Sequence, residues 1–182
     1  VELRIGCRPP SEGPLWLRVT GVGENTVLAG IVRLLDRAVA EKPRLAQLAD
    51  RVAGIVSIAG AGWHDPAKCQ PSSPVAVLQI HGTLDAVIQY GGGANLGVKY
   101  PGAEATVTAW AQRNGCGPKA TQDKAMDLDV LVPGAESEVH RFTGCQGGAA
   151  EWWQVHGASH FPKFPKGFAD TAWDWLQAHA KP

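Results

Sequence analysis

The stretch Val75-Ala-Val-Leu-Gln-Ile-His-Gly-Thr-Leu-Asp85 decides the fold class. Pro74 introduces a short apolar run, residues 75–80, and a small-residue turn then delivers the carboxylate of Asp85. A continuous apolar run of this length is typical of a strand buried on both faces of a mostly parallel sheet. We therefore expect residues 75–80 to form such a strand, with Asp85 just beyond its carboxyl end.

The segments around this strand predict an α/β fold. Runs of similar character predict further strands at residues 54–59, 138–142 and 151–155, and periodic apolar patterns predict helices at 103–112 and 168–180. Strands that alternate with loops and helices favour the α/β class. Between the strand at 75–80 and the helix at 103–112, the stretch Gly91-Gly-Gly93 lacks the Lys-Ser/Thr of a phosphate-binding loop. It is expected to be a flexible turn. Four tryptophans are expected to lie in the core: Trp152, Trp153, Trp173 and Trp175.

The first fifty residues have a different pattern. Residues 14–22 alternate between apolar and polar side chains and predict a strand. Residues 26–42, capped by Asn25 or Thr26, predict a long helix that Pro43 ends or kinks.

Composition excludes several function classes. The 182 residues carry 17 basic and 17 acidic side chains, so the chain offers no net charge to attract nucleic acid or an anionic membrane. No window reaches the roughly 18 apolar residues of a membrane-spanning helix. The chain opens on Val1-Glu-Leu-Arg4 rather than on a basic-then-apolar leader, so no signal peptide is expected. No Cys/His spacing suits zinc, and we expect neither a metal nor a cofactor.

The four cysteines leave two interpretations open. Cys116 and Cys145 lie in Gly-rich loops on either side of a strand-like segment and are a plausible bridged pair, which would imply an oxidising compartment. Cys7 and Cys69 are isolated in the sequence, and in this interpretation each is expected to stand alone. The alternative is four unpaired thiols in a reducing compartment.

Two loops are candidates for chemistry. Asp85 follows the strand at 75–80, and His156-Gly-Ala-Ser-His160 follows the strand at 151–155. A carboxylate that orients an imidazole, which then acts as a general base, is two thirds of a hydrolase triad. Asp85 precedes His160 by 75 residues, the order that α/β-hydrolases use after their serine. His81 and His156 are expected to be structural, and the pair His64-Asp65 alone is a weak metal site.

Residues 54–182 resemble the C-terminal half of the polyhydroxybutyrate-depolymerase and feruloyl-esterase type of α/β-hydrolase. The matching stretches include Val77-Leu-Gln-Ile-His-Gly-Thr-Leu-Asp85, Trp110-Ala-Gln-Arg-Asn-Gly-Cys116, Val139-His-Arg-Phe-Thr-Gly-Cys145 and Trp153-Gln-Val-His-Gly157. The resemblance implies Asp85 as triad acid, His160 as triad base and a Cys116–Cys145 bridge. It also implies an exported enzyme, secreted or periplasmic, that cleaves small esters or polyesters without a cofactor.

The chain departs from that family at the nucleophile. Such an enzyme presents its serine on a sharp turn written Gly-x-Ser-x-Gly. The six serines lack this frame: Ser11, Ser57, Ser72, Ser73, Ser137 and Ser159. The family resemblance would place the nucleophile a short way before residues 48–54. In this chain the predicted helix at 26–42 occupies that position. We therefore expect a truncated serine ester hydrolase without triad catalysis, because nucleophile and oxyanion hole are lost together.

Residues 13–54 resemble heavy-metal-transporting P-type ATPases. The matching stretches are Gly13-Pro-Leu-Trp-Leu-Arg-Val-Thr20, residues 22–35 and Glu41-Lys-Pro-Arg-Leu-Ala-Gln-Leu-Ala-Asp-Arg-Val-Ala-Gly54, without the ATPase phosphorylation or metal sites. Both families can carry a stretch like residues 48–54. The interpretation is a chimera joined there, with an ATPase-like part at residues 1–47 and a hydrolase-like part at 48–182. An ATPase fragment with a foreign tail and a non-enzymatic binding module are the alternatives; the oligomeric state is left open.

Overall fold

The computed structural model of the chain describes residues 54–71 and 73–180. The strand expected at 14–22, the helix expected at 26–42 and most of the shared stretch at 48–54 lie outside the described residues. The described residues belong to the part of the chain that resembles an ester hydrolase.

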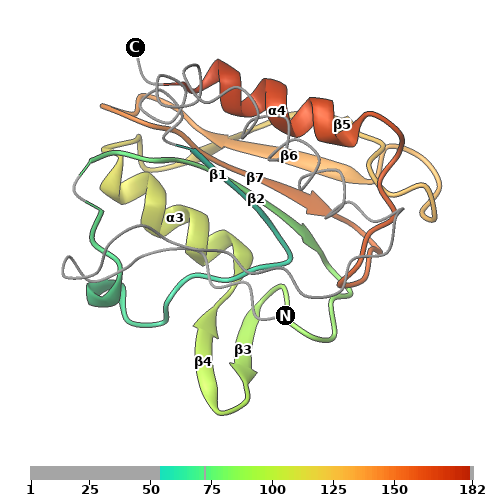
Figure 1. Cartoon of the computed structure of the whole chain (residues 1–182), viewed down its shortest axis with the longest axis horizontal. Helices are drawn as coiled ribbons and strands as arrows, with labels where there is room; N and C mark the ends of the chain where they lie inside the picture. Colours follow the sequence, from blue (N-terminus) through green and yellow to red (C-terminus); the bar gives the residue numbers. More distant parts are fainter. Residues whose placement is uncertain (1–53, 72, 181–182) are drawn as a thin grey trace, which may run out of the picture.

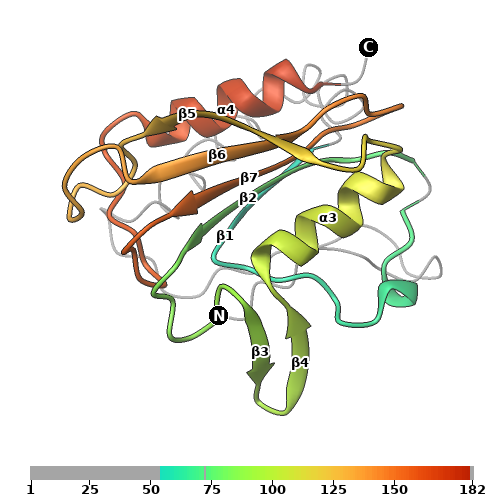
Figure 2. The ribbon, with the colours of Figure 1, turned by 180° about the vertical axis from the view of Figure 1, so that it is seen from behind.

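A five-stranded sheet forms the centre of this part. In chain order, the strands are β1 (Gly54–Ile58), β2 (Ala76–Gly82), β5 (Ala120–Met126), β6 (Ser137–Phe142) and β7 (Ala150–Val155). They lie side by side in the order β1-β2-β7-β6-β5 (Figure 2). β1, β2 and β7 are parallel, whereas β6 and β5 run antiparallel to their neighbours. The sheet is therefore mixed, and the expectation of a mostly parallel sheet was correct only for its first three strands.

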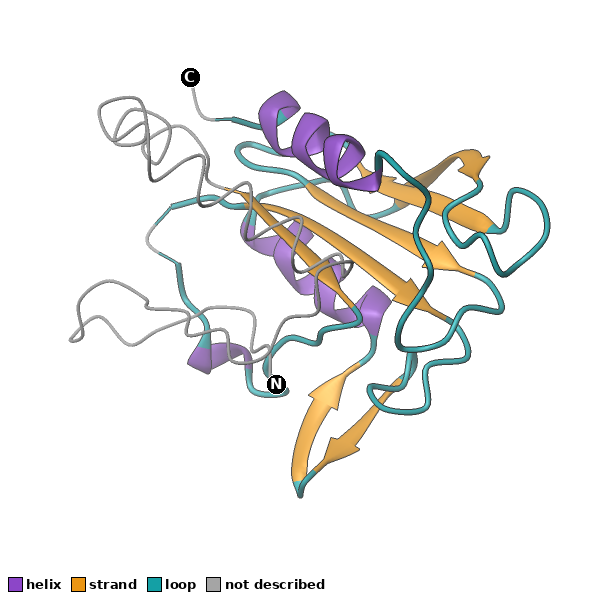
Figure 3. Cartoon of the chain, turned by 45° about the vertical axis from the view of Figure 1, so that its right-hand side comes forward, coloured by secondary structure: helices purple, strands orange, loops and turns teal. Residues whose placement is uncertain are grey.

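Two helices cover opposite faces of the sheet. α3 (Ala103–Arg113) lies on one face and α4 (Phe168–Ala178) on the other (Figures 1 and 3). Because side chains alternate along a strand, β2 supplies both layers: Leu78 and Ile80 pack in the α4 cluster, and Val77 packs against Trp110 of α3. All seven residues of β2 are buried. The α/β class predicted from the sequence is confirmed.

Most predicted elements are present with small shifts at their ends. The strand expected at 75–80 extends to Gly82, the helix expected at 103–112 ends at Arg113, and the helix expected at 168–180 ends at Ala178. Of the four tryptophans expected in the core, Trp152, Trp153 and Trp175 are buried and Trp173 is half-buried.

One hairpin corrects a prediction. β3 (Gly92–Asn95) and β4 (Val98–Pro101) form an antiparallel ribbon that projects from the molecule (Figure 1). Gly92 and Gly93 belong to β3, so the prediction of a flexible turn at 91–93 was wrong. A Cβ at Gly92 would lie 3.0 Å from the carbonyl carbon of Pro101 in β4 and 2.7 Å from the backbone nitrogen of Gly102, which follows it. A glycine with positive φ permits this close approach. The short 3₁₀ helix η1 (Pro66–Lys68) completes the set, with Asp65 capping it.

Candidate active site

The site residues come together because β2 and β7 are parallel neighbours. His81 pairs with Gln154 and Gly82 with Val155 in the register of the two strands, so both chains leave the sheet at the same edge. Gly82 permits the two loops to touch, because a Cβ there would lie 2.6 Å from the Ser159 carbonyl oxygen. The Leu84 N–H donates to the Ala158 carbonyl at 3.0 Å and joins the loops.

Asp85 and His160 are hydrogen-bonded to each other. Nδ1 of His160 lies 2.8 Å from Oδ2 of Asp85, whose side chain is fully buried, while the imidazole is 21% exposed. The other oxygen of Asp85, Oδ1, accepts the backbone N–H groups of Val87 at 2.8 Å and Ile88 at 2.9 Å. An ionised carboxylate accepts but does not donate, so Nδ1 of His160 carries the shared proton. Nε2 of the neutral ring is then left with a free lone pair, the arrangement of a general base.

His81 also contacts Asp85, which sequence reasoning did not anticipate. His81 is 1% exposed, and its Nε2 lies 3.1 Å from Oδ2 of Asp85 and 2.8 Å from the carbonyl oxygen of Ile88. Burial lowers the pKa of His81 below its ordinary value, although the Ile88 carbonyl and the Asp85 charge act in the opposite direction. The spacing of four residues between His81 and Asp85, across a tight turn, was the available signal.

Tyr90 packs beside this group. Its ring lies edge-on to the His81 ring with centroids 5.7 Å apart, and its hydroxyl donates to Oε1 of Gln154 at 3.0 Å. Burial raises the pKa of Tyr90 to about 12, so the hydroxyl stays protonated at neutral pH.

An exposed aromatic ring lies against His160. Phe161 is 79% exposed and places its ring against the His160 ring, with centroids 4.6 Å apart. Leu84, in the loop that carries Asp85, is also exposed. An exposed apolar side chain such as Phe161 offers contacts to an apolar ligand or to another protein surface.

None of the four serines in the described ranges is hydrogen-bonded to the His160 imidazole. Ser57 is buried in β1, and Ser137 is buried and donates to Oε1 of Glu136 at 2.7 Å. Ser159 is exposed, and its hydroxyl accepts the Phe161 N–H at 3.4 Å. Ser73 lies in the exposed turn before β2. None of these serines stands in the frame Gly-x-Ser-x-Gly.

The remaining histidines serve local contacts. Glu138 lies between two of them, 3.2 Å from Nε2 of His140 and 3.2 Å from Nε2 of His156. Asp65, next to His64, accepts the Ala67 N–H at 3.0 Å and so caps η1. Within residues 54–71 and 73–180 no group of three or more His, Cys, Asp or Glu is placed to hold a metal ion.

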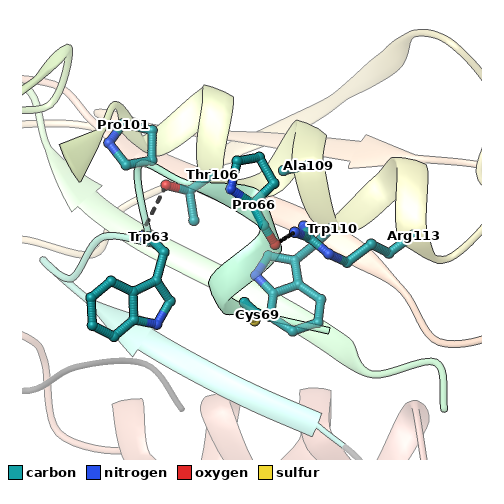
Figure 4. A pocket seen from close by; sticks show the side chains of 9 residues that line it. Trp63, Pro66, Cys69, Pro101, Thr106, Ala109, Trp110 and Arg113 are labelled. Atoms are coloured by element: carbon teal, nitrogen blue, oxygen red, sulfur yellow. Dashed lines mark hydrogen bonds between the residues drawn. The ribbon is translucent and has the colours of Figure 1, made fainter. Parts of the chain in front are cut away.

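A pocket lies between the η1 segment and α3 (Figure 4). Trp63 and Trp110 contribute its aromatic walls, Gly62 N–H donates to Oγ1 of Thr106 at 3.3 Å, and Arg113 donates to the Pro66 carbonyl at 3.2 Å (Figure 4). The residues that line this pocket include neither member of the Asp85–His160 pair.

The cysteines correct one expectation. Cys116 and Cys145 form a disulfide, the bridge that the family resemblance implied. Cys69 had been expected to stand alone, but it is buried and disulfide-bonded. Cys7 lies outside the described residues.

Comparison with known proteins finds similarity to an esterase and to a P-type ATPase, the two classes of protein that the sequence resembles. The chain is 27% identical over 124 residues to feruloyl esterase B of Piromyces equi, a match that covers 65% of this chain and 20% of that esterase. It is also 38% identical over 67 residues to cation-transporting P-type ATPase B of Mycobacterium bovis and of Mycobacterium tuberculosis, which covers 32% of this chain and 9% of each ATPase. The chain thus spans a fifth or less of these relatives. No protein-family model matches it.

Among the described residues, no helix has the length and apolar character needed to cross a membrane.

Proposed function

We propose that residues 54–180 are the acid–base half of a serine ester hydrolase of the feruloyl-esterase and polyhydroxybutyrate-depolymerase type. Asp85 is the acid of the triad, and His160 is the base that would take a proton from a nucleophile and return it to the leaving alcohol. The observation that carries the proposal is the 2.8 Å hydrogen bond between the buried Asp85 carboxylate and Nδ1 of the partly exposed His160. The similarity to feruloyl esterase B supports an ester as the substrate class.

In this proposal, the chain does not turn over esters by the triad route. The route needs a serine on a strand-to-helix turn and backbone donors for the oxyanion, and no serine here has the Gly-x-Ser-x-Gly frame. Removing one member of a triad costs most of its catalysis, because the members act as a unit. The imidazole of His160 is then a correctly oriented base without a nucleophile to serve.

A serine-directed fluorophosphonate probe followed by mass spectrometry tests this proposal on the full chain. We expect no labelled serine, and turnover of nitrophenyl acetate and methyl ferulate at the same rate in wild type, Asp85→Asn and His160→Ala. His156→Ala, a neighbouring exposed histidine that pairs with Glu138, is the matched control. A labelled serine, or turnover that Asp85→Asn and His160→Ala abolish while His156→Ala retains it, would refute the broken triad.

The Cys116–Cys145 disulfide supports an oxidising compartment as the location of this protein. Disulfides persist in oxidising surroundings, so we propose a secreted or periplasmic location, as for the exported enzymes that the chain resembles. The proposed partners are small ester or polyester molecules, and the neutral charge argues against nucleic acid.

The similarity to P-type ATPase B supports a second proposal, that the chain joins two unrelated segments. Residues 1–47 would derive from a transporter and 48–182 from a hydrolase, with the join in the stretch at 48–54 that both families can carry. The alternative function is then a transporter fragment with a foreign tail. We propose that this join is an assembly error, and a genuine gene fusion is the alternative. Amplification of source DNA across the codons for residues 30–70 tests this, and a clean product of the expected sequence would contradict the assembly error and favour the fusion.

A further inference from the structure

A buried chain of hydrogen bonds leads from the end of β1 to the Asp85–His160 pair. It begins at the carbonyl oxygen of Gly60, which accepts Nε2 of Gln79 at 2.9 Å. A backbone carbonyl can only accept, so the amide nitrogen of Gln79 must face Gly60. This fixes the direction of the Gln79 side chain, even though its Oε1 has no hydrogen-bond partner within the described residues.

The direction of the Gln79 amide determines the tautomer of His81. Nε2 of Gln79 also lies 3.1 Å from Nδ1 of His81, and both side chains are buried. The amide nitrogen donates, so Nδ1 of His81 must accept and cannot carry a proton. The proton of the neutral ring is therefore on Nε2.

The proton on Nε2 of His81 lies between two acceptors, the Ile88 carbonyl oxygen and the Asp85 carboxylate. The single N–H at Nε2 of His81 is shared between the Ile88 carbonyl oxygen at 2.8 Å and Oδ2 of Asp85 at 3.1 Å. The first contact holds the turn whose Val87 and Ile88 N–H groups bind Oδ1 of Asp85. The second supplies a donor to the same oxygen that accepts Nδ1 of His160.

We infer that His81 is a positioning residue for this pair: with its proton held on Nε2 by Gln79, it fixes the Asp85 carboxylate so that Oδ2 receives Nδ1 of His160. This role rests on the proposed function, in which Asp85 and His160 are the acid and base. His81 touches neither substrate nor reacting atoms and acts through Asp85. A rigid carboxylate keeps the His160 proton on Nδ1 and its lone pair on Nε2.

The test is an NMR measurement of histidine tautomers in the full 182-residue chain labelled with ¹⁵N-histidine. Long-range couplings in each ring show which nitrogen carries the proton, without any need for turnover. In wild type we expect His81 as a single Nε2–H tautomer and neutral His160 as the Nδ1–H tautomer. Wild-type His81 with its proton on Nδ1, or as a mixture of tautomers, would overturn the inference without any substitution.

Substitutions then separate positioning from packing. His81→Leu removes the donor and should lose the single Nδ1–H signature of His160. His81→Gln places an amide nitrogen near the position of Nε2 and should restore that signature. His156→Gln, which removes a histidine that does not contact Asp85, should leave it unchanged. A folded His81→Leu with the wild-type His160 signature, or a folded His81→Gln that lacks it, contradicts the positioning role.

A substitution at Asp85 distinguishes this inference from the proposed function. Because an Asn oxygen could still accept the Nδ1–H of His160, the decisive variant is Asp85→Leu, which removes both acceptors. If His160 keeps its Nδ1–H tautomer in a folded Asp85→Leu, the Asp85–His160 pair itself is wrong and the proposed function fails. If Asp85→Leu loses the signature while His81→Leu retains it, the pair stands and only the role of His81 fails.

Discussion

Asp85 accepts four hydrogen bonds in a fully buried position. Its Oδ1 receives two backbone N–H groups and its Oδ2 receives His81 and His160. A buried carboxylate needs such donors, because burial without them favours the neutral form. The site is therefore built around the charge of one residue, and the two histidines differ in that only His160 is partly exposed.

Glu136 is a second buried carboxylate and has a structural role. Its Oε1 accepts the backbone N–H groups of Leu128 at 2.9 Å and Asp129 at 2.8 Å and the hydroxyl of Ser137 at 2.7 Å. Burial alone would raise the pKa of Glu136, but these hydrogen bonds, together with its own backbone N–H, outweigh burial and lower its pKa below the ordinary 4.5.

Glu136→Gln is expected to destabilise the fold in a pH-dependent way. A lowered folded-state pKa contributes stability above pH 4.5 that is lost as the pH falls through the folded-state value. The variant should be less stable by about 1–3 kcal/mol at neutral pH, and the difference should shrink in acid. Urea unfolding from about pH 7 to about pH 3 measures this, with the exposed Glu104→Gln as control. A difference that stays constant with pH would contradict it.

At the scale of elements, β2 organises the molecule. It lies between β1 and β7, supplies core side chains to both helix layers, and ends at the loop of Asp85. Its beginning is held by Asn114 at the end of α3. The Asn114 amide donates to the carbonyls of Val75 at 2.7 Å and Ala149 at 2.9 Å, and its Oδ1 accepts the Val75 N–H at 3.3 Å. Helix α3 thereby fixes the starts of both β2 and β7.

Asn114→Ala should destabilise the fold by about 1–3 kcal/mol for each buried backbone group left without a partner. Asn114→Asp should cost more, because a carboxylate oxygen would then face two carbonyls where the amide donated. Gln112 is exposed on the same helix, so Gln112→Ala and Gln112→Glu are matched controls with small expected effects. Chemical denaturation measures all four variants, and equal stabilities for Asn114→Asp and Asn114→Ala would contradict the assigned amide orientation.

At the scale of the whole molecule, the Cys116–Cys145 disulfide closes a long loop. The two cysteines are 29 residues apart, and the loop contains β5 and β6. A cross-link of this span restricts the unfolded chain and stabilises the folded state by about 3–4 kcal/mol in the chain-entropy account.

The double variant Cys116→Ser/Cys145→Ser should lose about that amount of unfolding free energy in urea. Wild type treated with dithiothreitol should lose at least as much, because the disulfide of Cys69 is then reduced as well. A double variant as stable as the oxidised wild type would show that the bridge contributes nothing.

The sequence by itself determined the α/β class, the buried strands and the two candidate loops. Apolar runs such as residues 75–80 predict a strand directly, because burial on both faces leaves no polar alternation. The hairpin β3–β4 and the strand β5 escaped prediction. β5 has mostly exposed polar residues, and the hairpin turns at Leu96 and Gly97, both with positive φ, without the usual Asn-Gly pair at those positions.

The order Asp85 then His160 predicted a pair, and parallel β2 and β7 bring the two loops to one edge. The spacing of His81 and Asp85 hinted at a contact between them, but only the tertiary structure decided the tautomer of His81. That tautomer depends on Gly60 in the loop after β1, on Gln79 in the middle of β2 and on Ile88 in the loop after β2. Which ring nitrogen carries the proton depends on whether each contacting atom donates or accepts, so no pattern along the chain predicts the tautomer. The pairing of Cys69 was likewise decided in three dimensions.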